Sequence, residues 1–398
     1  MTSNFYKLAK EAEPALVKYL RDIVAIPSMS CDEERVVHRI EREMDKLGFD
    51  ETTIDPMGNL IGRVGSGSRS IALDAHIDTV DVTDEDQWET DPFDPIVKDG
   101  AVFGRGTTDM KAGNASSVYA AAILKESGLL PDDLSLYVTA TVQEEDCDGL
   151  CWQYIVNEDG LRPDCVVITE PTSLAVYRGQ RGRMEIEIST EGISCHGSAP
   201  ARGVNAVYKM ADVIEDVARL NQKLKPHEPL GKGSVAISQI RSTSPSLCAL
   251  ADGCIIHLDR RLTSGETEET AVAELQAMSS VQKAGARVTV LEYATPSYTG
   301  LVYPTKKYYP SWQMELDDPA IVAAIEGYRA AFESEPHLGY WVFSTNGVAT
   351  AGIHGIPTVG FGPGHEKHAH APNERVEIEH LVRAAAFYMS FATEFVQR

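Results

Sequence analysis

Short apolar segments alternate with helical patterns along most of this 398-residue chain, and this alternation restricts the possible folds more than any other feature. The apolar segments have the length and the β-branched residues of buried strands: 70–75, 136–142, 165–169 and 356–361. Helical patterns cover residues 112–126 and the segment that begins near Ile378. A further helix ends at Gly48, and Ser30–Glu33 before it has the pattern of a capping box. Strands that alternate with helices predict an α/β fold, in which helices flank a sheet.

A different pattern interrupts this alternation in the middle of the chain. Four strands and two helices are predicted there in the order βαββαβ, which is that of the ferredoxin-like split βαβ unit. We therefore expect two domains, as the chain length also favours. Residues 1–180 and 294–398 would form an α/β domain, and residues 181–293 an inserted ferredoxin-like lid.

The chain carries a large excess of negative charge. It has 36 Lys and Arg residues against 59 Asp and Glu residues, a formal net charge of −23. Phosphate backbones and anionic lipid would repel such a chain, which argues against a nucleic-acid or membrane partner. The excess either serves solubility alone or includes carboxylates that ligate divalent cations.

Cysteine usage and hydropathy bear on the cellular compartment. No apolar run has the length of a membrane-spanning helix, and the first residues lack the pattern of a signal peptide. Seven cysteines, an odd number, are scattered through a large chain, which is typical of reduced thiols. We expect a cytoplasmic protein. Cys147 and Cys151 have the spacing of half a zinc site, but the absence of a second pair at finger spacing argues against structural zinc.

Potential metal ligands follow the predicted strands. His76 and Asp78 stand two residues apart at a strand end, so they share one face and point into the crevice where α/β sheets bind ligands. Asp78 can ligate a metal itself or accept the other N–H of the histidine ring. Asp109 follows a glycine-rich turn that lacks the patterns of phosphate-binding loops. We interpret Asp109 as an inward-facing carboxylate that can bridge two cations.

Two more strands end in acidic residues. Glu144 and Glu145 follow the strand at 136–142, and because adjacent strand residues face opposite ways, one is predicted to bind metal and the other to exchange protons. Glu170 follows the next strand. A glycine-rich loop near the C-terminus supplies three histidines: His365, His368 and His370. Taken alone, His76 also fits a structural histidine, the two adjacent glutamates a solvated acidic loop, and the three histidines a surface cluster. The convergence of these signals on one edge of the sheet predicts a metal site.

Five motifs in this order resemble those of a known family. They are Ala75-His76-Ile77-Asp78, Gly104-Arg105-Gly106 with Asp109-Met110-Lys111, Glu144-Glu145, Thr169-Glu170-Pro171-Thr172 and His370-Ala371-Pro372-Asn373-Glu374. Over nearly its whole length, the chain resembles the two-zinc family of aminoacylase, acetylornithine deacetylase, succinyl-diaminopimelate desuccinylase and glutamate carboxypeptidase. Residues 143–152, 178–183 and 343–347 look most like its branch of selenium-metabolism-linked hydrolases, a label for gene context more than for chemistry.

The resemblance implies a zinc-peptidase-like catalytic domain that holds two divalent metal ions per subunit. Zinc is expected, with manganese or cobalt as alternatives. His76 and Glu170 would be terminal ligands of one ion. Glu145 and His370 would be those of the other, and Asp109 would bridge both. Two cations at roughly 3.5–4 Å lower the pKa of a bridging water and stabilise the oxygen that becomes anionic.

The same resemblance implies the reaction. Asp78 would orient His76, and Glu144 would be the general base. The expected function is hydrolysis of an amide-type C–N bond in a small carboxylate-bearing substrate, which is an N-acyl or N-carbamoyl amino acid or a dipeptide. The alternative from another class is a non-catalytic metal-binding or regulatory protein that keeps the fold. The intact set of metal ligands together with Glu144 and His196 argues against that alternative.

Residues outside the metal motifs also match family positions. His196 matches a histidine that reaches the active site of a neighbouring subunit and stabilises the oxyanion, which implies a homodimer through the lid domain. Asn205 and Arg261 match residues that hold the substrate carboxylate, an anion that a guanidinium fork suits. Asn346 is a further substrate-binding candidate, in a loop where many members carry an acidic residue. The Tyr- and Trp-rich connection at 297–313 either packs between the domains or reshapes the pocket.

Overall fold

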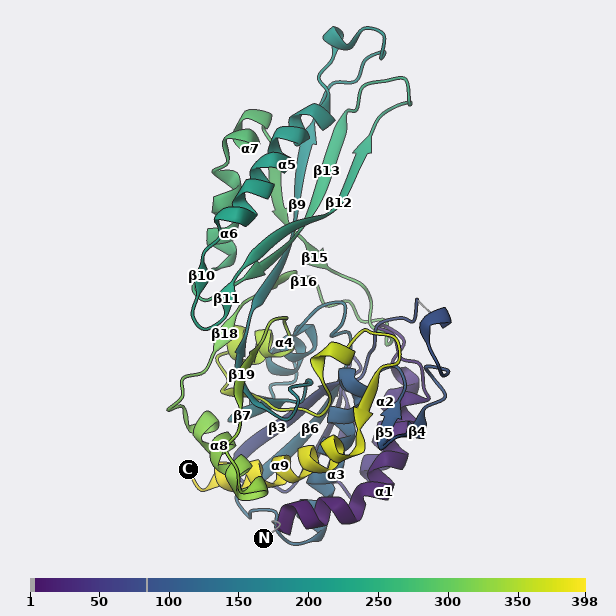
Figure 1. Cartoon of the computed structure of the whole chain (residues 1–398), viewed down its shortest axis with the longest axis vertical. Coiled ribbons are helices and arrows are strands. Elements are labelled where there is room, and N and C mark those ends of the chain that lie inside the picture. The colour runs from purple at the N-terminus through teal and green to yellow at the C-terminus, as the bar shows by residue number, and fades with distance from the viewer. Residues whose placement is uncertain (1–3, 84) are drawn as a thin grey trace.

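The central strands of the large sheet run parallel, so their carboxyl ends share one edge (Figure 1). The computed structural model describes residues 4–83 and 85–398, and nine of the described strands form this sheet. Its order is β1 (Glu51–Ile54), β2 (Leu60–Val64), β6 (Leu134–Thr141), β3 (Arg69–His76), β7 (Cys165–Ile168), β20 (Thr358–Gly360), β8 (Val176–Gln180) and β18 (Trp312–Gln313), with β19 (Leu338–Trp341) beside β8. The parallel strands are β6, β3, β7 and β20, whereas β2 and β8 join them antiparallel. The α/β prediction is confirmed.

Helices cover both faces of this sheet. Four of them pack together on one face: α1 (Asn4–Val24), α3 (Ala112–Glu126), α8 (Pro319–Phe332) and α9 (Ile378–Val396). The helix α2 (Glu34–Lys46) packs beside β1 and β2, and α4 (Leu150–Asn157) covers the other face of the sheet. Neighbouring residues of β3 point to opposite faces, so Leu73 and Ala72 belong to different apolar clusters. None of the helices described is long and apolar enough to cross a membrane.

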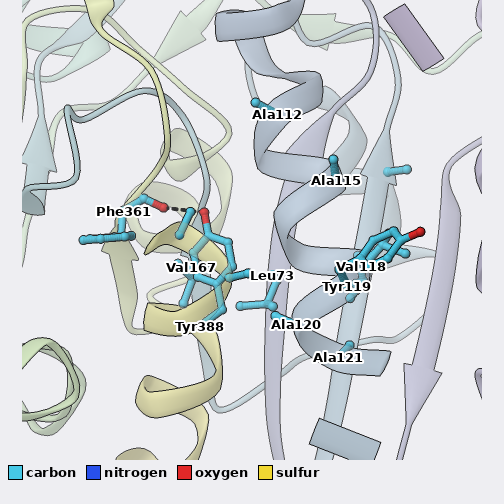
Figure 2. Close-up of a cluster of buried hydrophobic side chains, with 14 of the residues drawn as sticks. Leu73, Ala112, Ala115, Val118, Tyr119, Ala120, Ala121, Val167, Phe361 and Tyr388 are labelled. Carbon is cyan, nitrogen blue, oxygen red and sulfur yellow. Dashed lines mark hydrogen bonds between the residues drawn. The ribbon is translucent and has the colours of Figure 1, made fainter. Parts of the chain in front are cut away.

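Small side chains bring α3 close to the carboxyl ends of the strands. Figure 2 shows the alanines of α3 beside the strands, and Leu73 and Val167 beside Tyr388 of α9. The Tyr388 hydroxyl donates to the carbonyl oxygen of Phe361 at 2.8 Å. A Cβ added to Gly113 would lie 2.2 Å from Thr169 Oγ1, so only glycine permits this approach. The start of α3, and with it Asp109, is therefore held at the strand ends.

The smaller domain has the βαββαβ order that the sequence predicts. Its antiparallel sheet has the order β12 (Ser234–Thr243), β13 (Gly253–Leu262), β9 (Gly182–Glu191) and β14 (Arg287–Val290). The helices that pack against it are α5 (Ala206–Lys223), α6 (Glu268–Gln276) and the additional α7 (Ser279–Ala284). Met184, Ile186 and Ile188 of β9 are buried beneath these helices, while the residues between them form a polar face. Figure 1 shows this domain extending away from the large one.

The segment of residues 292–313, called the connection below, contains the aromatic residues 297–313 and belongs to both domains. After the lid helices and β14, β15 (Glu292–Tyr293) pairs with β16 (Thr305–Lys306). The next strand, β17 (Tyr308–Tyr309), pairs with β9 of the lid, and β18 then joins the large sheet. Tyr309 and Trp312 are buried, so the connection packs between the domains. The exact lid bounds of 181–293 stay a prediction, because residues up to Tyr309 contribute to the lid sheet.

Candidate metal centre

The parallel strands deliver the predicted metal ligands to one edge of the large sheet. His76 is the last residue of β3, and Glu170 follows β7 by two residues. Glu145 lies in the turn after β6, and His370 on the loop after β20. Asp109 comes from the turn that precedes α3. This edge is where open α/β sheets bind ligands.

The Asp109 carboxylate lies between two imidazoles. Its Oδ1 is 3.0 Å from His76 Nε2, and its Oδ2 is 3.2 Å from His370 Nε2. Glu170 Oε1 is 3.4 Å from the same His76 nitrogen, and Glu145 Oε2 is 3.0 Å from the same His370 nitrogen. The five predicted ligands therefore form two imidazole–carboxylate pairs with one shared carboxylate.

Asp78 organises the centre without facing the cavity. The backbone carbonyl of Asp78 lies 3.0 Å from His76 Nδ1, and its Oδ1 lies 3.5 Å from the same nitrogen. A proton on Nδ1 leaves the Nε2 lone pair directed at the carboxylates, which is the tautomer that binds metal. The Asp78 carboxylate also accepts the backbone N–H groups of Glu144 and Glu145, at 3.2 and 3.0 Å. Asp78 thus fixes a histidine and the acidic turn together.

The donor set fits divalent cations. Glu144 Oε1 and Glu170 Oε2 are buried, and neither accepts a hydrogen bond from a described residue. A buried carboxylate oxygen without a donor is unfavourable unless a cation neutralises it. Two overlapping groups have ligand atoms within 4.8 Å of one another: His76, Asp109 and Glu145, and His76, Glu144 and Glu170. Imidazole and carboxylate are the ligands of catalytic zinc.

Burial and the shared charges shift the ionisation of this centre. Burial raises the pKa of Glu145 to about 7 and that of Glu170 to about 8, and the negative charge of Asp109 adds to both shifts. Burial alone would also raise the pKa of Asp109, but the His370 and His76 imidazoles hold it below its ordinary value. Hydrogen bonds to Asp109 and Glu145 raise the pKa of His370 to about 11. Without a cation, the centre therefore holds protons at neutral pH.

The two glutamates after β6 do not follow strand alternation. The strand ends at Thr141, and Gln143 has a φ of +58°, so the chain turns before it reaches Glu144. Both Glu144 and Glu145 line the same cavity, and the expectation that they face opposite ways is wrong. Their surroundings still differ, because Glu145 contacts His370 whereas Glu144 Oε2 lies 3.8 Å from His76 Nε2.

One buried residue of the centre has no assigned role in the sequence prediction. Glu374 is fully buried, and its carboxylate accepts a hydrogen bond from the Arg105 guanidinium at 2.7 Å. It also accepts the backbone N–H groups of Gly106, Thr108 and Asp109, at 3.0, 2.7 and 3.0 Å. Glu374 therefore shapes the turn that presents Asp109. The sequence signal that could have identified Glu374 is its position at the end of the fifth motif, four residues after His370.

The cavity beside the centre has a volume of about 680 Å³ and is lined by residues of both domains. Carboxylates of the metal centre line it together with Arg183 and Arg261, which face each other on β9 and β13. Arg261 is paired with Asp259 at 2.8 Å. Val342 and Phe343 add an apolar wall. The cavity lining thus combines predicted metal ligands with guanidinium groups.

Three predicted site residues lie elsewhere in this chain. His196 is exposed on the loop after β9, with Nδ1 2.7 Å from Ser198 Oγ, and Asn205 caps α5 by accepting Val207 N–H at 2.9 Å. Asn346 is buried and donates to Asp74 Oδ2 at 2.9 Å. The described lining of the cavity includes Arg261 but none of these three residues.

A further histidine group lies on the loop that carries His370. His365, Glu377 and His380 bring their ligand atoms within 4.8 Å of one another. However, His380 Nδ1 accepts the Gly364 N–H at 3.1 Å, so the neutral ring carries its proton on Nε2. No lone pair of His380 is then left for a cation, and this group does not fit a third metal ion.

Known proteins are similar to this chain in sequence and fold. Residues 72–394 match the model of peptidase family M20/M25/M40. The chain is 53% identical over 380 residues to the uncharacterized protein YgeY of Escherichia coli K12, covering 96% of this chain and 94% of that one. It is 28% identical over 323 residues to a probable succinyl-diaminopimelate desuccinylase of Staphylococcus epidermidis, covering 80% and 74%. The Bacillus subtilis YXEP protein, described as a dinuclear metal binding peptidase, has a TM-score of 0.69 at 15% identity, covering 96% and 98%.

An α/β fold whose strand ends gather imidazoles and carboxylates around a cavity fits a metal-dependent hydrolase. The family match spans most of the chain, and the chain belongs to peptidase family M20/M25/M40. It is therefore an enzyme that hydrolyses amide bonds with the help of metal ions, and its residues fit two such ions. The predicted family is confirmed.

Proposed function

We propose that this enzyme cleaves the amide-type C–N bond of a small carboxylate-bearing substrate, which is an N-acyl or N-carbamoyl amino acid or a dipeptide. One observation carries the proposal. The Glu144 carboxylate lines the same cavity as every predicted metal ligand except His76. The Oε1 atom of Glu144 accepts no hydrogen bond from a described residue. A buried acid that faces a cation site without a fixed partner is suited to proton transfer.

In this proposal, the residues of the chain divide the work. His76, Asp109, Glu145, Glu170 and His370 hold two cations, most suitably zinc. When bound, two cations acidify water and polarise the carbonyl of the substrate. Glu144 accepts the proton of the attacking water and passes it to the leaving nitrogen. Burial raises the pKa of Glu144, and a raised pKa favours a carboxylate that first takes up a proton and then donates it.

The guanidinium groups of the cavity lining would bind the anionic end of the substrate. Arg261 lines the cavity and is about one-third exposed there, so its guanidinium is accessible to a carboxylate. Its present partner, Asp259, lies on the same strand. A substrate role for Asn205 and Asn346 stays a prediction from the resemblance, since neither residue lines this cavity and each hydrogen-bonds to another residue of this chain.

We also propose that the enzyme is a cytoplasmic homodimer joined through the lid. Several apolar side chains are exposed on the lid: Ile193, Val204, Tyr208 and Ile240. The strand β12 is an edge of the lid sheet, and such edges pair readily with another chain. The loop that carries His196 lies at the end of the lid far from the large domain (Figure 1). His196 would therefore serve the cavity of a neighbouring subunit.

Amine release from a substrate panel tests the proposed activity. The panel comprises N-acetyl, N-succinyl, N-formyl and N-carbamoyl amino acids together with dipeptides. The protein is stripped of metal and reloaded with zinc, manganese or cobalt. We expect cleavage of one subset, only after reloading. Folded, metal-loaded protein that cleaves no member of the panel would contradict the proposed substrate class.

A further inference from the structure

The turn that carries Glu144 and Glu145 is hydrogen-bonded to the strand by which the chain leaves the lid. Tyr293 lies in β15, and its hydroxyl accepts from Gln143 Nε2 at 2.9 Å. The same hydroxyl donates to Asp146 Oδ2 at 3.0 Å. Tyr293 is 7% exposed and Gln143 is 1% exposed, so the first of these bonds is shielded from water. One phenol therefore binds both residues that flank the glutamate pair.

A second tyrosine of the connection contacts the same turn. The buried Tyr309 hydroxyl donates to Cys147 Sγ at 3.4 Å, and its strand β17 pairs with β9 of the lid. Between the two tyrosines, Lys307 lies 3.0 Å from Glu185 Oε2 on β9. The Lys307 ammonium also lies 5.7 Å from the centroid of the Tyr293 ring. The lid sheet is thus linked to the turn by a continuous set of contacts.

Glu144 depends on this turn for its orientation. Its Oε1 accepts no hydrogen bond from a described residue, and its Oε2 comes no closer than 3.8 Å to His76 Nε2. The backbone is held instead: Asp78 accepts the Glu144 N–H, and Glu33 Oε1 accepts the Gln143 N–H at 3.0 Å. These bonds anchor the turn to the large domain, while Tyr293 anchors it to the connection. A shift of the connection relative to the large domain would therefore move the carboxylate.

We propose that Tyr293 is a positioning residue for Glu144. Tyr293 thereby couples the placement of the lid to the orientation of the general base. This inference rests on the proposed function, in which Glu144 transfers the proton. Tyr293 contacts neither the substrate cavity nor the metal ligands, so its effect passes through Gln143 and Asp146. Misplacement of a reacting group by about 1 Å can lower a rate about 100-fold, so a small rotation of the turn is sufficient.

The variant Tyr293→Phe tests this role, since it removes only the hydroxyl. We expect kcat to fall by about tenfold, with KM within about twofold of the wild type and with two metal equivalents still bound. The matched control is Tyr298→Phe. Tyr298 lies in the same connection, but its hydroxyl donates to Gly58 O at 3.0 Å and not to a residue of the turn. The control should retain the wild-type kcat.

Three kinetic results would overturn the proposal. They are an unchanged kcat in Tyr293→Phe, an equal loss in Tyr298→Phe, and a change confined to KM. Wild-type protein without turnover would instead contradict the proposed function, and the positioning role would fall with it. Turnover that is lost in Glu144→Gln but unaffected in Tyr293→Phe would contradict the positioning role alone.

Amide hydrogen exchange of the metal-loaded protein gives a readout independent of turnover. We expect peptides that span residues 142–148 to exchange faster in Tyr293→Phe than in the wild type or in Tyr298→Phe. Peptides from β3 should exchange as in the wild type, because the variant leaves the contacts of that strand intact. Equal protection of the turn in all three proteins would show that the hydroxyl does not hold it.

Discussion

Two polar residues, Ser30 and Glu33, form long-range hydrogen bonds that their sequence pattern does not predict. The pattern Ser30–Glu33 resembles a capping box, but α2 begins at Glu34 without a side-chain cap. The Ser30 hydroxyl donates to Asp78 Oδ2 at 2.7 Å instead, and Glu33 accepts the Gln143 N–H. Such long-range partners cannot be read from local sequence, because a cap and a tertiary hydrogen bond use the same residue types.

Glu374 should support both the fold and the affinity for metal. The substitution Glu374→Gln removes the negative charge of the carboxylate to which Arg105 and three backbone N–H groups donate. Breaking a buried ion pair costs about 3–5 kcal/mol, and loss of a residue that orients a ligand lowers metal affinity about 10–100-fold. Urea denaturation and a competition titration with a chelator measure the two effects. The control is Glu89→Gln, whose exposed side chain should be replaceable without change.

Metal binding should release protons and strengthen as the pH rises. In the metal-free protein, burial raises the pKa of Glu145 to about 7 and that of Glu170 to about 8. Below these values both carboxyls hold protons that a cation must displace, so affinity should increase from pH 6 to pH 8. Calorimetric titration with zinc in buffers of different ionisation enthalpy measures the protons released. Equal affinity at both pH values, with no proton release, would contradict these shifts.

At the scale of elements, the strands and helices could be predicted well and their ends poorly. Alternating apolar patterns identify β3, β6, β7 and the βαββαβ order of the lid, because burial on each face fixes the pattern. The sequence also predicts that the candidate metal ligands lie together, since parallel strands end at one edge, and the structure brings these residues together. It misses the turn at Gln143, where a positive φ of 58° on a residue other than glycine is supported by tertiary contacts that the local sequence does not reveal.

Asn346 ties together the ends of three elements, and its removal should affect stability more than substrate binding. Its Nδ2 donates to Asp74 of β3 and to Thr141 of β6, and its Oδ1 accepts the Gly149 N–H at the start of α4. Leaving such groups buried and unpaired costs about 1–3 kcal/mol, so Asn346→Ala should lower the free energy of unfolding by that amount.

The kinetics of Asn346→Ala distinguish a structural role from a substrate contact. Because the residue does not line the cavity, KM for the best panel substrate should stay within about twofold of the wild type. A tenfold rise in KM with unchanged stability would instead assign Asn346 to the substrate. Asn157→Ala, at the exposed end of α4, is the control and should change neither quantity.

At the scale of the whole molecule, the loop between β9 and α5 lies at the end of the lid far from the large domain (Figure 1). This loop carries His196, which does not line the described cavity of its own chain. If His196 acts on a neighbouring subunit, two inactive variants should complement each other. Coexpression of His196→Ala with Glu144→Gln creates mixed dimers, in which one cavity has an intact Glu144 and receives an intact His196. We expect turnover from these mixed dimers and almost none from either variant alone.

A second pairing controls for this complementation. Glu144→Gln and His370→Ala damage the cavity of the chain that carries them, so no mixed dimer regains a complete site. Turnover in this pairing, or its absence in the first one, would contradict action of His196 across subunits. Sedimentation of the wild type gives the oligomeric state on which both pairings depend.

The most direct test of the account is the rate of Glu144→Gln, measured together with its metal content. Glutamine keeps the shape of the side chain but cannot accept the proton, and a general base contributes about 10²–10⁴-fold to the rate. We predict a loss of at least 100-fold in kcat with two metal equivalents still bound. A variant that binds both ions and keeps more than about a tenth of the wild-type rate would contradict the role of Glu144.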